Sequence, residues 1–139
     1  MSTEIELGFR WIYSTLSGDS TLQGLTPGGV SRSYAQPGTS TPYVIMSFQS
    51  GTDVMAFGGR AYSDMFFQVV AVAPTKVMQS VLDAAARIDV LLTVTQKTNV
   101  TGGVLLSSFR SQPYSNDSLV DGETWSTTGG IYQIMAKAS

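Results

Sequence analysis

Histidine and cysteine are both absent from the 139-residue sequence. Without cysteine the chain has no disulfide, no thiolate metal ligand and no thiol nucleophile. Without histidine it lacks the usual general base near neutral pH, the usual partner of a serine nucleophile and the commonest metal ligand. We therefore expect that the protein is not an enzyme, and that it holds no catalytic residue, cofactor or metal.

Charged residues are scarce, at 13% of the chain, and the formal net charge is -2. Sequence-independent binding to phosphates requires an excess of lysine and arginine, which this composition does not provide. A nucleic acid wrapped by the protein is therefore not expected. The longest nearly apolar stretch, residues 65–73, is much shorter than the ~20 residues of a membrane-spanning helix, so we also expect no membrane partner.

The clearest pattern that the sequence does contain lies in residues 42–92. Residues 43–49 and 64–73 each predict a strand, and residues 51–63 between them predict a glycine-rich loop. Pro74 separates the second strand from a predicted amphipathic helix. Its apolar residues recur at helical spacing: Val77, Val81, Ala84, Ala85, Ile88, Leu91 and Leu92. Because both strands are apolar on two faces, we predict helices on one side of the sheet and a neighbouring subunit or second sheet on the other.

The flanking segments complete the expected fold. Thr3 and Glu6 have capping-box spacing and predict the start of a first helix that ends near Gly18. Its predicted apolar face consists of Ile5, Phe9, Ile12 and Leu16. Residues 30–34 predict a short edge strand, residues 104–112 and 124–136 predict two more strands, and residues 114–123 predict a loop.

Gly129 and Gly130 predict a bulge or bend in the last strand. The whole chain, residues 1–139, is expected to form a single α+β domain. We predict a mixed, mostly antiparallel β-sheet packed against two α-helices, in the order α-β-β-β-α-β-β.

Two groups of residues are candidates for a site. Met55 and Phe57, in the predicted loop, indicate a partner surface if they are exposed, or fold back onto their own sheet. Asp117, Asp121 and Glu123 form an acidic cluster that could hold a hard cation, but their spacing does not match a calcium loop. We expect solvated loop charges instead.

The chain resembles the tail-terminator proteins of long-tailed bacteriophages, also called tail-completion or tail-to-head joining proteins. The resemblance covers most of residues 3–136. It rests on the helix over residues 9–16, Pro37 and Gly38 followed by residues 42–45, the strand Met65-Phe66-Phe67-Gln68-Val69-Val70, and the helix after Pro74.

This resemblance implies a subunit that assembles with its own copies into a ring, typically a hexamer. Such a ring caps the tail tube protein, stops tube polymerisation and offers a joining surface to the head-tail connector or neck protein, while DNA only passes through the pore. The protein would be located in the virion, in the tail or neck, and in the host cytoplasm during assembly. For contacts between subunits or with the tube we expect Met55, Phe57, Tyr114, Leu119 and Trp125.

Two other functions are compatible with the sequence. One is a neck protein on the head side, such as a stopper or head-completion subunit, which would bind the portal or adaptor in preference to the tail tube. The other is a small ligand-binding α+β module or carboxylate enzyme that uses Asp117, Asp121 and Glu123, whose replacement by amides would then abolish activity.

Overall fold

A computed structural model describes residues 3–139, so Met1 and Ser2 lie outside the described residues. The elements in chain order are α1 (Glu4–Ser17), α2 (Ser20–Leu25), β1 (Val30–Arg32), β2 (Tyr43–Ala56), β3 (Gly59–Pro74), the 3-10 turn η1 (Thr75–Val77), α3 (Met78–Leu92), β4 (Thr98–Val100), β5 (Gly103–Val120) and β6 (Glu123–Ala138). The α+β class is confirmed. The predicted order lacked α2 and β4, which are short elements of six and three residues.

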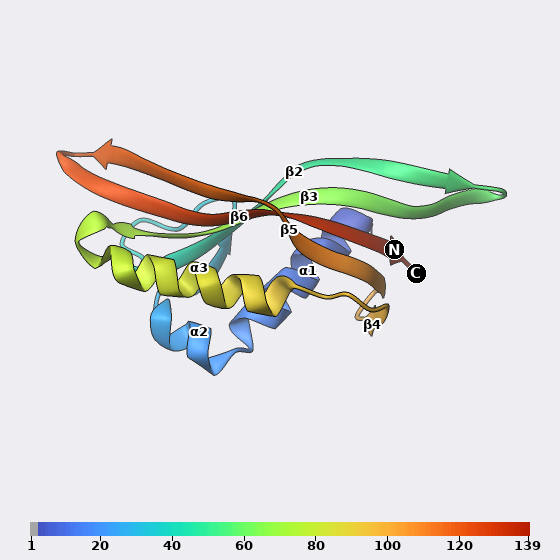
Figure 1. The fold of residues 1–139 in the computed structure, drawn as a ribbon, viewed down its shortest axis with the longest axis horizontal. Helices are drawn as coiled ribbons and strands as arrows, with labels where there is room; N and C mark the ends of the chain where they lie inside the picture. The colour runs from blue at the N-terminus through green and yellow to red at the C-terminus, as the bar shows by residue number, and fades with distance from the viewer. Residues whose placement is uncertain (1–2) are drawn as a thin grey trace.

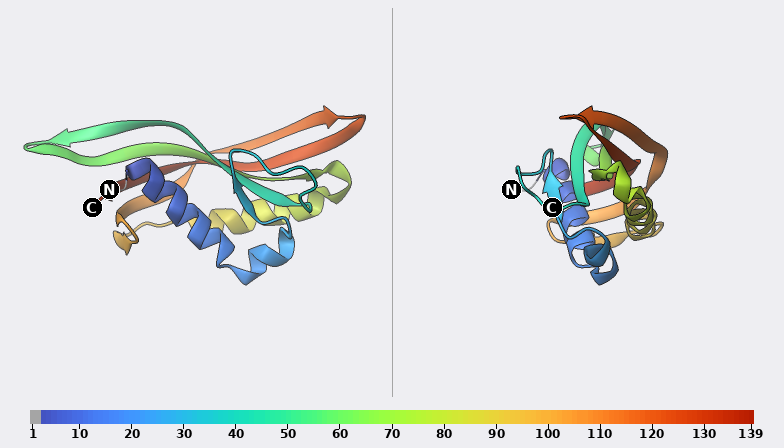
Figure 2. Two further views of the ribbon diagram at one scale, coloured as in Figure 1. Left: turned by 180° about the vertical axis from the view of Figure 1, so that it is seen from behind. Right: turned by 90° about the vertical axis from the view of Figure 1, so that its left-hand side faces the viewer.

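The strands form one curled sheet in the order β1-β2-β3-β6-β5-β4. The β1–β2 pair is parallel and all other neighbours are antiparallel, so the sheet is mixed as predicted. Figures 1 and 2 show α1, α2 and α3 together on one side of this sheet. The predicted edge strand is confirmed, because β1 lies at one edge and β4 at the other.

Two predicted loops are strands in the structure. Residues 51–63 belong almost entirely to β2 and β3, which turn at Phe57 and Gly58, and residues 114–120 continue β5. The second turn has Asp121 at φ 51° and Gly122 at φ 79°, the two positive values that a tight type I′ hairpin requires. Both hairpins are largely exposed to solvent, so they lack a regular apolar pattern, and the backbone pairing between their strands does not depend on one.

The predicted bulge at Gly129 and Gly130 is wrong, because β6 pairs with β3 and β5 there without a register shift. The shift lies opposite, in β5, between Arg110 and Gln112. A Cβ on Gly129 would lie 2.1 Å from the carbonyl oxygen of Val69 in β3. Glycine is needed at this position because β3 and β6 approach too closely for any side chain.

The core lies between the sheet and α1 and α3. In α1, Phe9, Ile12 and Leu16 are buried as predicted, whereas Ile5 is 39% exposed because the buried face runs through Leu7 instead. In α3 the prediction holds for Val81, Ala84, Ala85, Ile88 and Leu92. The exceptions are Val77, which is exposed in η1, and Leu91, which is half-buried.

Phe67 of β3 is the centre of this core. Its ring makes edge-to-face contacts with Phe9 at 5.0 Å and with Phe48 at 5.4 Å between centroids. Gly8 lets α1 reach it, since a Cβ there would lie 2.5 Å from the Phe67 ring. The aromatic contacts therefore connect α1, β2 and β3 at one point.

Asp19 joins the helices to one another. Its carboxylate caps α2 by accepting a hydrogen bond from the Leu22 amide at 2.9 Å, and it accepts two more from Arg87 of α3, at 2.9 and 2.7 Å. These bonds lower the pKa of Asp19 from 3.8 to about 2, the Arg87 bonds having the largest effect. The short helix α2 is thus held against α3 by a bidentate ion pair.

Among residues 3–139, the helices are all too short or too polar to cross a membrane.

Candidate interaction surfaces

Two β-hairpins extend from opposite ends of the molecule, as Figure 1 shows. We call residues 50–63 of β2 and β3 the first arm, and residues 114–128 of β5 and β6 the second arm. Met55 at the end of the first arm is 68% exposed and Phe57 is fully exposed, so neither folds back onto its own sheet. Leu119 at the end of the second arm is 72% exposed. Exposed apolar side chains at projecting tips are features of surfaces that contact a partner.

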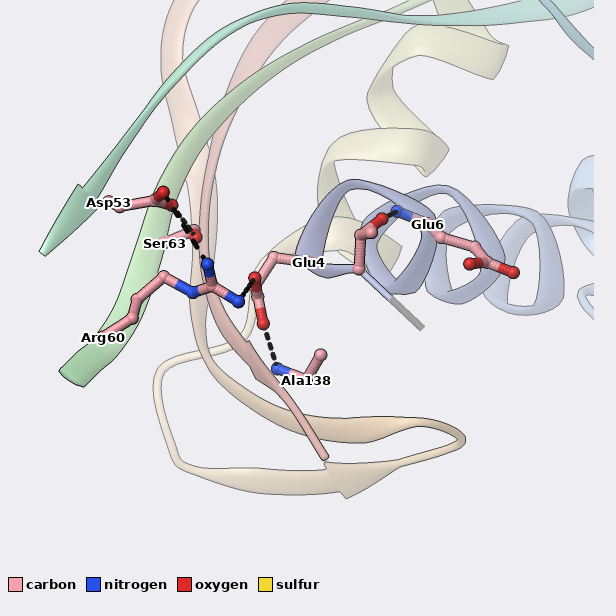
Figure 3. A network of polar contacts seen from close by, with 7 residues as sticks. Glu4, Glu6, Asp53, Arg60, Ser63 and Ala138 are labelled. Carbon is pink, nitrogen blue, oxygen red and sulfur yellow. Dashed lines mark hydrogen bonds and ion pairs between the residues drawn. The ribbon is translucent and has the colours of Figure 1, made fainter. Parts of the chain in front are cut away.

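The first arm is attached to the body by a polar network around Glu4, shown in Figure 3. The Glu4 carboxylate is buried, lies 2.7 Å from the Arg60 guanidinium and accepts a hydrogen bond from the Ala138 amide at 2.7 Å. Asp53 accepts a hydrogen bond from the Ser63 hydroxyl and lies 3.8 Å from Arg60. A buried carboxylate requires such partners, so Glu4 ties Arg60 of the arm to the start of α1.

A shallow hollow of about 340 Å³ lies behind the tip of the first arm. It is lined by Ala56, Phe57, Gly58, Gly59, Arg60, Ala61 and Lys137. Lys137 is exposed, and none of the ion pairs formed by residues 3–139 includes it. The apolar tip is therefore accompanied by one cation that is unpaired within residues 3–139, Lys137, and by Arg60, whose charge is matched by Glu4 and Asp53.

The second arm carries an apolar pocket near its end, which we call the Trp125 pocket. It has a volume of about 420 Å³ and lies between the arm and residues 35–39. Its apolar walls come from Tyr43, Val72, Val120 and Trp125, with Pro37 on the loop side. Trp125 itself is half-buried, so part of the indole remains accessible.

The loop that closes this pocket is a defined turn. The Thr39 amide donates to the Gln36 carbonyl at 3.1 Å, and Gly38 has φ 83° directly after Pro37. Proline followed by a residue with positive φ is the pattern of a type II turn. The wall of the pocket is thus preformed.

Tyr114 lies in a different hollow, of about 370 Å³, between the second arm and α3, where it meets Leu82, Ala85 and Ala86. The five predicted contact residues therefore fall on two surfaces. Met55 and Phe57 lie at one end of the molecule, and Tyr114, Leu119 and Trp125 lie on the second arm. Their role in contacts stays a prediction.

The acidic residues of the second arm do not converge. Asp117 accepts a hydrogen bond from the Ser126 hydroxyl at 2.9 Å, Asp121 occupies the turn and Glu123 is exposed beside it. Within the described part of the chain, no group of three or more acidic, histidine or cysteine side chains is placed to hold a metal ion. The three carboxylates act as solvated strand and turn residues.

Sequence reasoning missed Arg60, Lys137, Val120 and the turn at residues 36–39 as parts of these surfaces. The Asp121-Gly122 dipeptide was the available signal for the second arm, because this pair between two extended segments is typical of a tight hairpin. The pocket gave no such signal, since its walls come from five separate segments.

Comparison with known proteins gives a structural match only. No protein-family model matches the chain, and no curated protein matches it either. A chain from the virion of a native gene transfer agent (GTA) particle has a TM-score of 0.72 at 13% sequence identity, with 99% of this chain and 100% of that chain covered. A second solved structure, whose description states no function, has a TM-score of 0.60 at 18% identity over 96% of each chain. At these identities the likeness establishes a shared fold over almost the whole length of each chain.

Proposed function

We propose that this protein is a structural subunit of a phage-like virion with the role of a tail terminator. The observation that carries the proposal is the likeness to the GTA virion chain, which extends over 99% of this chain and 100% of that one. A match of whole chain to whole chain is stronger support than a shared motif, because it concerns the fold of the entire subunit.

The two arms support assembly into a ring. They lie at opposite ends of the molecule and differ in chemistry, as a contact between two different patches on identical copies requires. Contacts of this kind close into a ring when the rotation between neighbours permits it. In our proposal the ring is a hexamer that caps the tail tube, stops its polymerisation and offers its other face to a neck protein.

A structural role also accounts for the surface chemistry better than catalysis does. The candidate surfaces consist of apolar tips, an apolar pocket and solvated carboxylates that do not converge. The net charge of -2 suits a pore through which DNA passes without being held. We therefore propose no enzymatic activity and no cofactor.

Light scattering coupled to size-exclusion chromatography tests the proposal, on the purified protein alone and with its cognate tube protein. We expect a single ring-sized species that binds tube ends and limits tube length in electron micrographs. A protein that stays monomeric and never binds tube contradicts the proposal. Binding to portal or adaptor in preference to tube would instead support a neck protein on the head side.

A further inference from the structure

Among residues 3–139, nothing covers the two apolar side chains at the tip of the first arm. Phe57 is fully exposed, and Met55, two residues before it, is 68% exposed. An aromatic ring exposed to water at the end of a hairpin lowers the solubility of the protein and does not stabilise its fold. Its position is best explained by a contact that forms on assembly.

The Trp125 pocket has the properties of the matching surface. It is lined by Tyr43, Val72, Val120 and Trp125, and its volume of about 420 Å³ is within the range of ~300–1,000 Å³ typical of pockets that enclose small organic groups. It lies at the opposite end of the molecule from Phe57 (Figure 1), so the two cannot meet within one chain.

The charges beside the two features are complementary. Lys137 and Arg60 line the hollow directly behind the Phe57 tip; Arg60 is already paired with Glu4 and Asp53, whereas Lys137 is in none of the ion pairs among residues 3–139. Beside the pocket, Glu123 is the cross-strand neighbour of the pocket residue Val120, and Asp121 lies in the adjoining turn. Residues 111–136 contain no lysine or arginine that could neutralise these acids from within the second arm.

We propose that the first arm of one copy docks on the second arm of the next copy, with Phe57 inserted into the Trp125 pocket. In this contact the unpaired Lys137 faces Glu123 and Asp121, so that opposite charges lie beside an apolar centre, as is usual in protein interfaces. The inference rests on the proposed ring, for which it names the contact between subunits. Because the two patches differ, the contact is heterologous and repeats from copy to copy around the ring.

Cross-linking tests the contact directly, because the sequence contains no cysteine of its own. The variant Ala56→Cys with Ser118→Cys places thiols beside the tip and in the pocket lining, and it leaves Phe57 in place. Treatment of the assembled protein with a short bismaleimide should give a ladder of covalent multimers that ends at the ring size. The matched control, Ala56→Cys with Ser14→Cys, places the second thiol on the exposed face of α1 and should give no ladder.

Charge reversal gives an independent measurement. Lys137→Glu and Glu123→Lys should each raise the concentration needed for half-assembly by about tenfold or more, and the double variant should return it to within about threefold of the wild type. Phe57→Ala should weaken assembly at least as much as either reversal, because aromatic anchors dominate interface energies. All of these positions are exposed, so folding is not at risk.

The results separate the two proposals. If rings form but the Ala56→Cys, Ser118→Cys variant gives no more cross-linking than its control, the proposed docking contact is wrong. The proposed ring would still stand. A second arm that cross-links to tube protein and not to another copy overturns the contact in the same way. A chain that neither forms rings nor binds tube overturns the proposed function, and the docking contact with it.

Discussion

The Arg60 guanidinium of the first arm lies 2.7 Å from the buried Glu4 carboxylate in the first turn of α1. The two residues are 56 positions apart in sequence, and the contact connects the arm, two residues after its turn, to the start of the chain's first helix. The arm that we propose to reach a neighbouring subunit is thus tied to the body by this ion pair, and Glu4 is held in turn by the Ala138 amide.

Replacing Arg60 by alanine should destabilise the protein by about 1–3 kcal/mol, because Glu4 then loses its cationic partner while it stays buried. Urea unfolding measures this change. Arg10→Ala is the matched control: it breaks the exposed Arg10–Glu6 pair, 3.0 Å apart, and should cost less than about 1 kcal/mol. Equal losses in the two variants would contradict the role assigned to Glu4. Adding Glu4→Gln to the Arg60→Ala variant should recover part of the stability, since no unpaired charge is then buried.

The ion pair between Asp19 and Arg87 should make stability depend on acidic pH. The pKa of Asp19 falls from 3.8 in the unfolded chain to about 2 in the folded one, so its contribution is fully present above pH 3.8 and is lost as the pH falls through about 2. Asp19→Asn should lower the melting temperature at pH 7, and the difference from the wild type should shrink between pH 4 and pH 2. The control is Asp83→Asn, at an exposed position of α3 where the carboxylate accepts a hydrogen bond from Gln79 and is in none of the ion pairs among residues 3–139. A difference between Asp19→Asn and the wild type that is constant across this range would exclude the pair as its source.

Gly129 should tolerate no side chain. A Cβ there meets the Val69 carbonyl oxygen at 2.1 Å, which is backbone and cannot move aside, so Gly129→Ala should cost at least about 2 kcal/mol. Gly24→Ala in α2 is the control, and it should change the free energy of unfolding in the opposite direction. A Cβ added at this position has no atom within 4 Å, and the higher helix propensity of alanine should stabilise the protein by about 0.5–1 kcal/mol. Thermal unfolding of both variants checks this pair.

Two phenylalanines should separate folding from assembly. Phe67→Ala removes the ring at the centre of the core and should cost about 3–5 kcal/mol in unfolding free energy. Phe57→Ala should change stability by less than about 0.5 kcal/mol, because the ring has no contacts to lose in the isolated chain. Denaturant unfolding of dilute, monomeric protein measures both. A large loss for Phe57→Ala would show that the tip packs on its own chain after all.

The parts of the fold that bury apolar residues on one face could be predicted from the sequence. Both long helices, the first half of β2 and most of β3 could be predicted, because apolar residues recur at helical spacing in the helices and alternate in the strands, as at Phe67 and Val69. The arms could not be found in this way, since a ribbon solvated on both faces has no hydrophobic period. Only the turn residues, such as Asp121 and Gly122, indicate where such a ribbon reverses.

The candidate surfaces were predictable only in part. Met55, Phe57 and Leu119 could be named because large apolar residues stood among polar ones. Their division between two ends of the molecule depends on the strand order, in which β6 is inserted between β3 and β5. The approach of residues 35–39 to Trp125 likewise follows from the folded chain and from no local pattern.

The register shift between Arg110 and Gln112 in β5 protects the protein against aggregation through the edge of its sheet. Beyond the bridge between Val94 and Ser108, the outer edge of β5 from Phe109 to Val120 is uncovered by any other described strand. A long free edge of this kind can template the addition of strands from other molecules into fibres. In β5 the irregular backbone is followed at once by Pro113, which has no amide hydrogen to donate, so the edge cannot offer an unbroken row of hydrogen bonds. This design permits side-chain contacts at the arm while it hinders open-ended sheet growth along it.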